Sequence, residues 1–180
     1  IRSAGIDSIN LDLIYGLPHQ SKESFAATLE QITALEPDRV AMFGYAHVPW
    51  MARRQILIDE RSLPDARKRR ELLELGRHHF SANGMTAVGI DHFARPDDPL
   101  VIAAKKRILR RNFQGYTEDQ SAVLIGIGAS AISRFPQGYA QNAAGTSTYK
   151  EIIANNKLGT CRGHHMDRDD ALLGFVIEQL

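Results

Sequence analysis

The chain has 180 residues, of which 43% are hydrophobic and 24% are charged, and its formal net charge at pH 7 is +1, all ordinary values for a globular protein. A net charge this small gives no general electrostatic reason to expect nucleic acid or a membrane surface as a partner, and no apolar run approaches the roughly 20 residues of a membrane-spanning helix. No secretory signal is recognisable and the single cysteine, Cys161, cannot form an internal disulfide, so we expect a cytoplasmic protein.

The first expected strand covers residues 8–15, because its polarity alternates with a period of two. Leu11 and Leu13 share one face of this strand, whereas Asn10 and Asp12 share the other. One face is therefore suited to a packed core and the other to a polar environment.

Helices and strands alternate along most of the remaining chain, with proline, glycine and capping residues at their expected ends. The expected elements are a helix from Ser21 to Pro37, a strand over 39–46, a helix from Pro64 to about residue 82, a strand over 85–90, a helix over 96–109, a short buried strand or extended segment over 123–127, a helix over 146–158 and a last helix capped by Asp167. Both ends of the chain lie within helical patterns, so we expect a piece of a longer protein.

This alternation predicts an α/β fold with a parallel sheet or barrel. Parallel strands that are covered on both faces tend to be apolar on both faces, so the polar face of the first strand indicates a polar lumen. Barrel enzymes carry their reactive groups at the carboxyl ends of the strands, and Asp12, Ala46 and Asp91 lie at or near three such ends. We expect an open-topped barrel whose rim binds a ligand.

Asp12 is the strongest single candidate for a functional residue. An ionised carboxylate that is buried on a strand costs several kcal/mol unless it is paired or hydrogen-bonded. A ribose diol or an ammonium group of a ligand would satisfy it, and so would a structural ion pair with an arginine on a neighbouring strand. Both interpretations remain open on the residues alone.

Asp91 and His92 are compatible with an acid–base pair, because histidine transfers protons near neutral pH. The better interpretation is structural: Asp91 accepts hydrogen bonds and holds the end of the strand in shape. A metal site is not expected, because the seven histidines show no ligand spacing with cysteine.

The segment over 111–117 places an amide, Gln114, between Phe113 and a glycine, just ahead of a small-residue loop over 125–133. Gly126 and Gly128 allow close backbone approach, but they lack the lysine of a phosphate loop and the third glycine of a dinucleotide motif. We expect a tight edge at which Ile132 contacts a planar group.

Two basic runs remain, over 67–70 and over 105–111. The first is expected to be a solvated helix face. The second adjoins the Gln114 segment, and we hypothesise that Arg110 and Arg111 help to hold a polycarboxylate substrate.

Four segments together resemble the family of oxygen-independent coproporphyrinogen III oxidases, which are radical S-adenosylmethionine proteins of haem biosynthesis. These segments are Asn-Leu-Asp-Leu-Ile-Tyr-Gly-Leu-Pro over 10–18, residues 43–49, Asp-His-Phe-Ala-Arg-Pro-Asp-Asp over 91–98, and Arg-Asn-Phe-Gln-Gly-Tyr-Thr over 111–117. The resemblance runs from about Ser3 to about Asp170, and the last two segments separate this family from related haem chaperones.

The resemblance implies a catalytic chemistry. Members of the family bind a 4Fe–4S cluster through closely spaced cysteines and bind two S-adenosylmethionine molecules near it. Reductive cleavage gives a 5′-deoxyadenosyl radical, and the oxidative decarboxylation of coproporphyrinogen III then yields protoporphyrinogen IX. The implied partners are this substrate and an electron donor for the cluster.

The resemblance also implies roles for six residues. Asp12 and Ala46 match contacts of the second S-adenosylmethionine with Ile14 beside them, Ile132 matches an apolar contact of the molecule at the cluster, and Phe113 and Gln114 match residues needed for activity. Carboxylate and amide oxygens suit hydrogen bonds to the cofactor, and apolar side chains exclude water from a reactive radical.

For the fold, the resemblance implies the C-terminal part of a partial parallel (β/α) radical SAM barrel over 1–143, followed by the start of a helical C-terminal domain over 144–180, in a monomer. Cys161 cannot replace a cysteine triad, so the chain holds no cluster ligands and is expected to be inactive by itself. Arg107 stands where the family pattern has glycine, and Glu118 where it has a second threonine.

Two other functions are weighed beside the oxidase. A haem-binding or haem-delivery relative without oxidase activity would bind haem tightly, although the region from Asp91 to Thr117 favours the oxidase. An unrelated barrel lyase would use Asp12 as base and His92 as acid.

Overall fold

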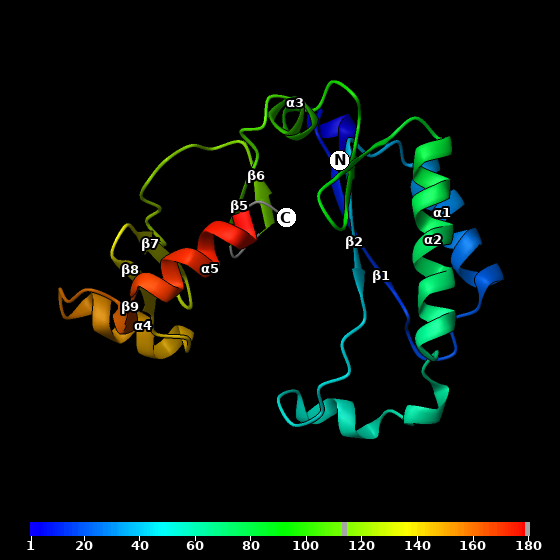
Figure 1. Cartoon of the computed structure of the whole chain (residues 1–180). Helices are drawn as coiled ribbons and strands as arrows, with labels where there is room; N and C mark the ends of the chain where they lie inside the picture. Colours follow the sequence, from blue (N-terminus) through cyan, green and yellow to red (C-terminus); the bar gives the residue numbers. More distant parts are fainter. Residues whose placement is uncertain (113–114, 179–180) are drawn as a thin grey trace. The chain divides into compact units, whose positions relative to one another are not determined.

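The computed structural model describes residues 1–112 and 115–178, and its ribbon is drawn in Figure 1. Phe113 and Gln114 lie outside the described residues, so the roles expected for them stay predictions. The chain divides into two compact units at residues 109 and 110. The domain boundary expected at residues 143 and 144 comes from the family resemblance and likewise stays a prediction.

The first unit contains a four-stranded sheet in the order β1-β2-β4-β3. Its strands are β1 (Asn10–Tyr15), β2 (Arg39–Gly44), β3 (Thr86–Val88) and β4 (His92–Ala94). Only β1 and β2 pair in parallel, whereas β4 runs antiparallel to both β2 and β3.

The strand expected over 85–90 is present as β3, but the sequence analysis missed β4, which follows it. Gly89, with a φ of 59°, starts a short loop that reverses the chain and turns this region into the β3–β4 hairpin. The α/β class is confirmed, but the sheet is mixed and the described strands do not close into a barrel.

Three helices belong to this unit: α1 (Lys22–Ala34), α2 (Ala66–Ala82) and α3 (Pro99–Lys105). Each begins at the polar residue that its sequence supplies. Ser21 forms a capping box with Ser24, and Asp65 and Asp98 accept hydrogen bonds from backbone N–H groups in the first turns of α2 and α3. Helix α3 is shorter than expected. Short 3-10 turns occupy Arg2–Ala4, Arg53–Leu57 and Glu60–Ser62.

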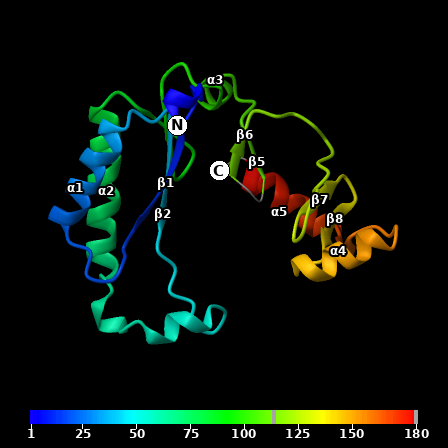
Figure 2. The same cartoon turned by 180° about the vertical axis from the view of Figure 1, so that it is seen from behind.

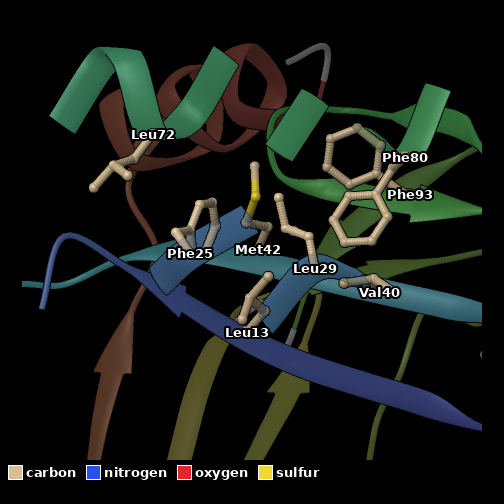
Figure 3. Close-up of a cluster of buried hydrophobic side chains, with 8 residues drawn as sticks. All are labelled: Leu13, Phe25, Leu29, Val40, Met42, Leu72, Phe80 and Phe93. Atoms are coloured by element: carbon tan, nitrogen blue, oxygen red, sulfur yellow. The ribbon is translucent and has the colours of Figure 1, made fainter. Parts of the chain in front are cut away.

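Helices α1 and α2 lie side by side along one face of β1 and β2, as views from opposite sides show (Figures 1 and 2). The core lies between the helices and the sheet and is formed by the apolar faces of β1, β2 and β4 together with side chains of α1 and α2 (Figure 3). Its buried members are Leu13, Phe25, Leu29, Val40, Met42, Leu72, Phe80 and Phe93. The rings of Phe80 and Phe93, from α2 and β4, lie 5.0 Å apart between centroids.

The second unit contains two small antiparallel sheets that the sequence analysis did not identify. One is the hairpin of β5 (Arg110–Asn112) and β6 (Gly115–Thr117), and the other has the order β7-β8-β9, with β7 (Ile132–Phe135), β8 (Gly138–Asn142) and β9 (Thr160–His165). Helices α4 (Thr146–Ala154) and α5 (Arg168–Glu178) complete the unit. Asp167 caps α5 as expected, because its carboxylate accepts from two backbone N–H groups of the first turn.

The burial expected for the strand or extended segment over 123–127 is wrong. Leu124 makes only an isolated bridge with Arg134, and Ile125 and Ile127 are 62% and 87% exposed. Apolar residues alone suggested burial here, and no element of the second unit covers these two side chains.

Within the part of the chain that the structure describes, no helix is both long enough and apolar enough to cross a bilayer.

Candidate functional site

The face of the first sheet opposite α1 and α2 carries the candidate residues of the first unit. Asp12 pairs in register with Ala41, and Ala41 pairs with His92, so these three residues form one row across β1, β2 and β4. With strands roughly 4.8 Å apart, the backbones of Asp12 and His92 lie about 10 Å from each other. The alternation of the strand thus places Asp12 on the face away from the helices, as expected.

The expected burial of Asp12 is wrong for this chain. Its side chain is exposed, Ile14 two residues further is 44% exposed, and Asn10 donates a long hydrogen bond of 3.4 Å to the Asp12 carboxylate. Both helices lie against the opposite face, so Asp12 keeps its hydration. Ala41, its neighbour in the row, is buried and adds no bulk beside the carboxylate.

The structural alternative for Asp12 finds no support among the described residues. Arg39 of the neighbouring strand instead forms an ion pair with Asp98, at 2.6 Å between Nε and Oδ2. No salt bridge to Asp12 occurs within the described part of the chain. Its carboxylate is therefore open to a ligand.

Ala46 lies in the loop that leaves β2, and a glutamine fixes the conformation of this loop. Gln55 donates from Nε2 to the carbonyl of Ala46 at 3.1 Å and accepts from the N–H of Val48 at 2.6 Å. The sequence analysis missed Gln55, because nothing in its local pattern links it to a loop nine residues earlier. The small side chain of Ala46 is exposed beside this clamp.

Arg69 of α2 holds the start of the same loop. Its guanidinium donates to the carbonyl of Tyr45 at 2.7 Å, while the N–H of Tyr45 donates to the carbonyl of Tyr15 at 2.8 Å. A Cβ on Gly44 would lie 3.0 Å from both the Arg69 guanidinium and the Tyr15 hydroxyl, so glycine lets these groups pass closely. The carboxyl ends of β1 and β2 are therefore fastened together.

Asp91 and His92 take the structural role that the sequence analysis favoured. Nδ1 of His92 lies 2.7 Å from Oδ1 of Asp91, and the carbonyl of Asp91 accepts from the N–H of Met42 at 2.7 Å. The Phe43 ring meets the His92 ring edge-on at 6.0 Å. These contacts order the end of the β3–β4 hairpin.

The opposite end of the sheet is tied together by Asp38. Its carboxylate accepts from the N–H of Ile9 at 2.8 Å and from the guanidinium of Arg95 at 3.1 Å, and it pairs with Arg2 at 3.4 Å. The hydrogen bond from Ile9, followed by the side chain of Arg95, lowers the pKa of Asp38 below its usual value. Asp38 thus links the starts of β1 and β2 to the residue that follows β4.

In the second unit, Gly126 packs against the main chain of Ile132. A Cβ on Gly126 would lie 2.7 Å from both the carbonyl carbon and the carbonyl oxygen of Ile132. The N–H of Gly126 also donates a hydrogen bond to Oγ of Ser133 at 3.0 Å, which holds the loop against β7. The close approach expected at this loop is real, but its partner is the backbone of β7.

The side chain of Ile132 lines a groove of about 340 Å³ on the β7–β8–β9 sheet, which is hereafter called the sheet groove. Its lining combines apolar, aromatic and hydrogen-bonding groups. The lining residues are Ile132, Tyr139, Gln141, Arg162, Gly163 and His164. Its volume lies at the lower end of the range for small-molecule sites.

A smaller cavity of about 30 Å³ lies beside the β5–β6 hairpin and is hereafter called the arginine pocket. Arg110, Arg111 and Arg134 contribute to its lining together with Asp119. The guanidinium carbon of Arg111 lies 5.4 Å from the centroid of the Tyr116 ring. The basic run expected to hold a polycarboxylate is therefore placed at a cavity, which is large enough for a water molecule or the tip of one anionic group.

The donor groups for an iron–sulfur cluster are not present in this chain. Cys161, its single cysteine, is exposed on β9, and no group of three or more metal-binding side chains occurs among the described residues. Cluster ligation needs several thiolates, so these residues do not fit that group.

The comparisons with known proteins agree with the motifs. No family model matches the chain. It is 54% identical over 180 residues to "Coproporphyrinogen III oxidase, anaerobic 1" of Cereibacter sphaeroides and 52% identical over 180 residues to an oxygen-independent coproporphyrinogen III oxidase of Paracoccus denitrificans. Both matches cover the whole chain and 40% of the relative.

A solved structure shows the same similarity. The coproporphyrinogen III oxidase of Escherichia coli, described as a radical SAM enzyme, matches with a TM-score of 0.89 and 40% identity, over 99% of this chain and 41% of that one. The resemblance expected from the four segments is thereby confirmed over the full chain, which spans about 40% of the length of these curated relatives.

Proposed function

We propose that this chain is part of the catalytic region of an oxygen-independent coproporphyrinogen III oxidase. The complete protein would carry out the oxidative decarboxylation of coproporphyrinogen III to protoporphyrinogen IX. The similarity to named oxidases over all 180 residues is the observation that carries this proposal. The finer expectations of a partial parallel barrel, a boundary at residues 143 and 144, a monomeric state, a separate electron donor and a cytoplasmic setting belong to the same proposal.

The open face of the first sheet supports a cofactor role. Asp12 offers an exposed carboxylate without an ionic partner among the described residues, which suits a ribose diol or the ammonium group of S-adenosylmethionine. Ala46 leaves space beside the Gln55 clamp, and Ile14 offers an apolar contact on the same face as Asp12. These three residues would bind the second of two S-adenosylmethionine molecules.

Ile132 has the complementary role in the second unit. Its side chain lines the sheet groove, and we assign it an apolar contact with the S-adenosylmethionine that lies at the cluster. Phe113 and Gln114, just after β5, would exclude water and orient the cofactor through the amide. When bound at a reduced cluster, S-adenosylmethionine supplies the radical that starts the reaction.

The cluster itself must be held by cysteines outside these 180 residues, since this chain has only Cys161. The chain alone, supplied with S-adenosylmethionine and a reductant, is expected to release no 5′-deoxyadenosine. Release of this product by the isolated chain would refute the assignment of cluster binding to other residues.

The activity is best tested in a hybrid enzyme. These 180 residues replace the 180 matching residues of the Cereibacter sphaeroides relative, and conversion of coproporphyrinogen III is measured without oxygen. We expect protoporphyrinogen IX and 5′-deoxyadenosine to form. A folded hybrid that forms a tight stoichiometric haem complex and yields neither product would favour the haem-delivery function instead.

A further inference from the structure

The sheet groove contains an arginine that is held in position by a second side chain. Oε1 of Gln141 accepts from Nε of Arg162 at 2.7 Å, and Nε2 of Gln141 donates to the carbonyl of Ser130 at 3.0 Å. Both ends of the amide are therefore used, which fixes its orientation and that of the guanidinium beside it.

The terminal nitrogens of Arg162 remain available. Among the residues that the structure describes, the bond to Gln141 is the only hydrogen bond of its side chain. A planar guanidinium that is fixed through Nε presents its two terminal N–H₂ groups as a fork, and this fork matches the two oxygens of a carboxylate. Positioning by Gln141 lowers the entropy cost of such a contact.

The neighbours of Arg162 are suited to a ring-bearing ligand. Ile132, Gln141 and Arg162 follow one another in register across β7, β8 and β9, and Tyr139 and His164 form the next row on the same face. The Tyr139 ring gives an apolar floor beside the charged fork. His164 is occupied, because its Nε2 lies 2.9 Å from Oδ2 of Asp170.

We propose that the sheet groove binds one carboxylate-bearing pyrrole of the substrate, with Arg162 as the anchor of a propionate carboxylate and Tyr139 as the contact of the ring. Gln141 is a positioning residue that acts through Arg162. At about 340 Å³ the groove holds one edge of a tetrapyrrole and leaves the remaining rings outside. The identity of the substrate rests on the proposed function, whereas the affinity for a carboxylate rests on the groove alone.

The proposal is tested by the binding of coproporphyrin III to the 180-residue chain, which is measured through the fluorescence of the porphyrin. Arg162→Gln is expected to raise Kd about tenfold, since the hydrogen bonds that it loses are charge-assisted. Gln141→Leu is expected to raise Kd by a smaller factor. Arg168→Gln, which removes the same charge from an exposed position in the same unit, should change Kd less than twofold.

The tetramethyl ester of coproporphyrin III separates the carboxylate contact from a loss of folding. Arg162→Gln should not alter the affinity for this ester, because an ester has no negative charge to pair with the guanidinium of Arg162. Equal Kd values of the parent and Arg162→Gln for coproporphyrin III, or an equal loss for acid and ester, would overturn the anchor while leaving the oxidase assignment intact.

A titration with sodium propionate tests the site without the tetrapyrrole. The Nε–H resonance of Arg162 should shift in a saturable way and should not do so with propionamide. A saturable shift together with no binding of coproporphyrin III would support the carboxylate site and count against the proposed substrate. No shift with propionate would overturn the site itself.

Discussion

Nε of Arg39 lies 2.6 Å from Oδ2 of Asp98, and the Asp98 side chain is only 5% exposed. The same carboxylate accepts from the N–H of Leu100 at 2.8 Å and so caps α3. One buried group therefore joins β2 to the start of α3, and its loss would leave Arg39 without its ionic partner.

Replacement of Asp98 should be among the most costly single changes in the first unit. Breaking a partly buried ion pair and a helix cap together is expected to cost about 3 kcal/mol. We expect Asp98→Ala to lower the free energy of unfolding by this amount in urea. Asp98→Asn, which loses the charge but keeps an oxygen for the cap, should cost less, and equal losses in the two variants would contradict a contribution of the cap.

The pKa of Asp38 gives a pH-dependent contribution to stability. The hydrogen bond from Ile9 and then the side chain of Arg95 lower its pKa in the folded state. The contribution is therefore fully present above the unfolded value, roughly 3.9, and is lost as the pH falls through the lower folded value.

Asp38→Asn should accordingly lower Tm at pH 7, and the difference from the parent should shrink as the pH is lowered below about 4. Thermal unfolding at a series of pH values measures this. Asp7→Asn serves as the control, because Asp7 is exposed and no ion pair of its carboxylate occurs among the described residues. A constant difference at all pH values would contradict the electrostatic origin of the effect.

Arg107 adopts a backbone conformation that favours glycine. Its φ is 57°, and it ends α3 in a Schellman motif, in which Arg107 donates to Ala104 and Ile108 donates to Ala103. The departure from the glycine of the family pattern has therefore kept the geometry of glycine. Non-glycine residues pay roughly 1–2 kcal/mol for this conformation.

Arg107→Gly is thus expected to stabilise the chain by about 1 kcal/mol and to raise Tm by a few degrees. Lys106→Gly, one residue earlier in a helical conformation with φ −80°, should destabilise by a similar amount. Opposite signs in the two variants, measured by urea unfolding, identify the φ of Arg107 as the cause. The same sign in both would exclude it.

The arginine pocket predicts a second contribution to the binding of an anionic ligand. Arg110→Gln combined with Arg111→Gln is expected to weaken coproporphyrin III binding on the order of tenfold and to reduce its dependence on salt. The matched control is Arg67→Gln combined with Arg70→Gln, which removes two charges from the surface of α2. An unchanged affinity in the variant that lacks both Arg110 and Arg111 would exclude a role of the arginine pocket in binding the ligand.

The sequence predicted the elements that carry strong local signals. The period of two in β1 placed Asp12 and Leu13 on opposite faces, and Ser21 and Asp167 marked the starts of α1 and α5 correctly. The burial of Asp12 was not predictable from its strand, because exposure depends on which elements cover a face. Local alternation contains no information about that.

The second unit was less accessible to sequence analysis. Strands of three residues, such as β5 and β6, are too short to show a period, and the pairing of β8 with β9 depends on contacts between residues distant in the chain. Arg162 and Gln141 were missed for the same reason, since 21 residues separate the two side chains that meet. Only the register of β8 against β9 reveals the groove.

The most direct test of the account is the affinity of the hybrid enzyme for S-adenosylmethionine with and without the Asp12 carboxylate. We expect Asp12→Asn to weaken binding by about tenfold or more and to reduce the formation of 5′-deoxyadenosine, because the lost contact is charge-assisted. Asp7→Asn, three residues before β1, should change neither quantity. Unchanged affinity and product formation in Asp12→Asn would contradict the assignment of the open sheet face as the cofactor-binding face.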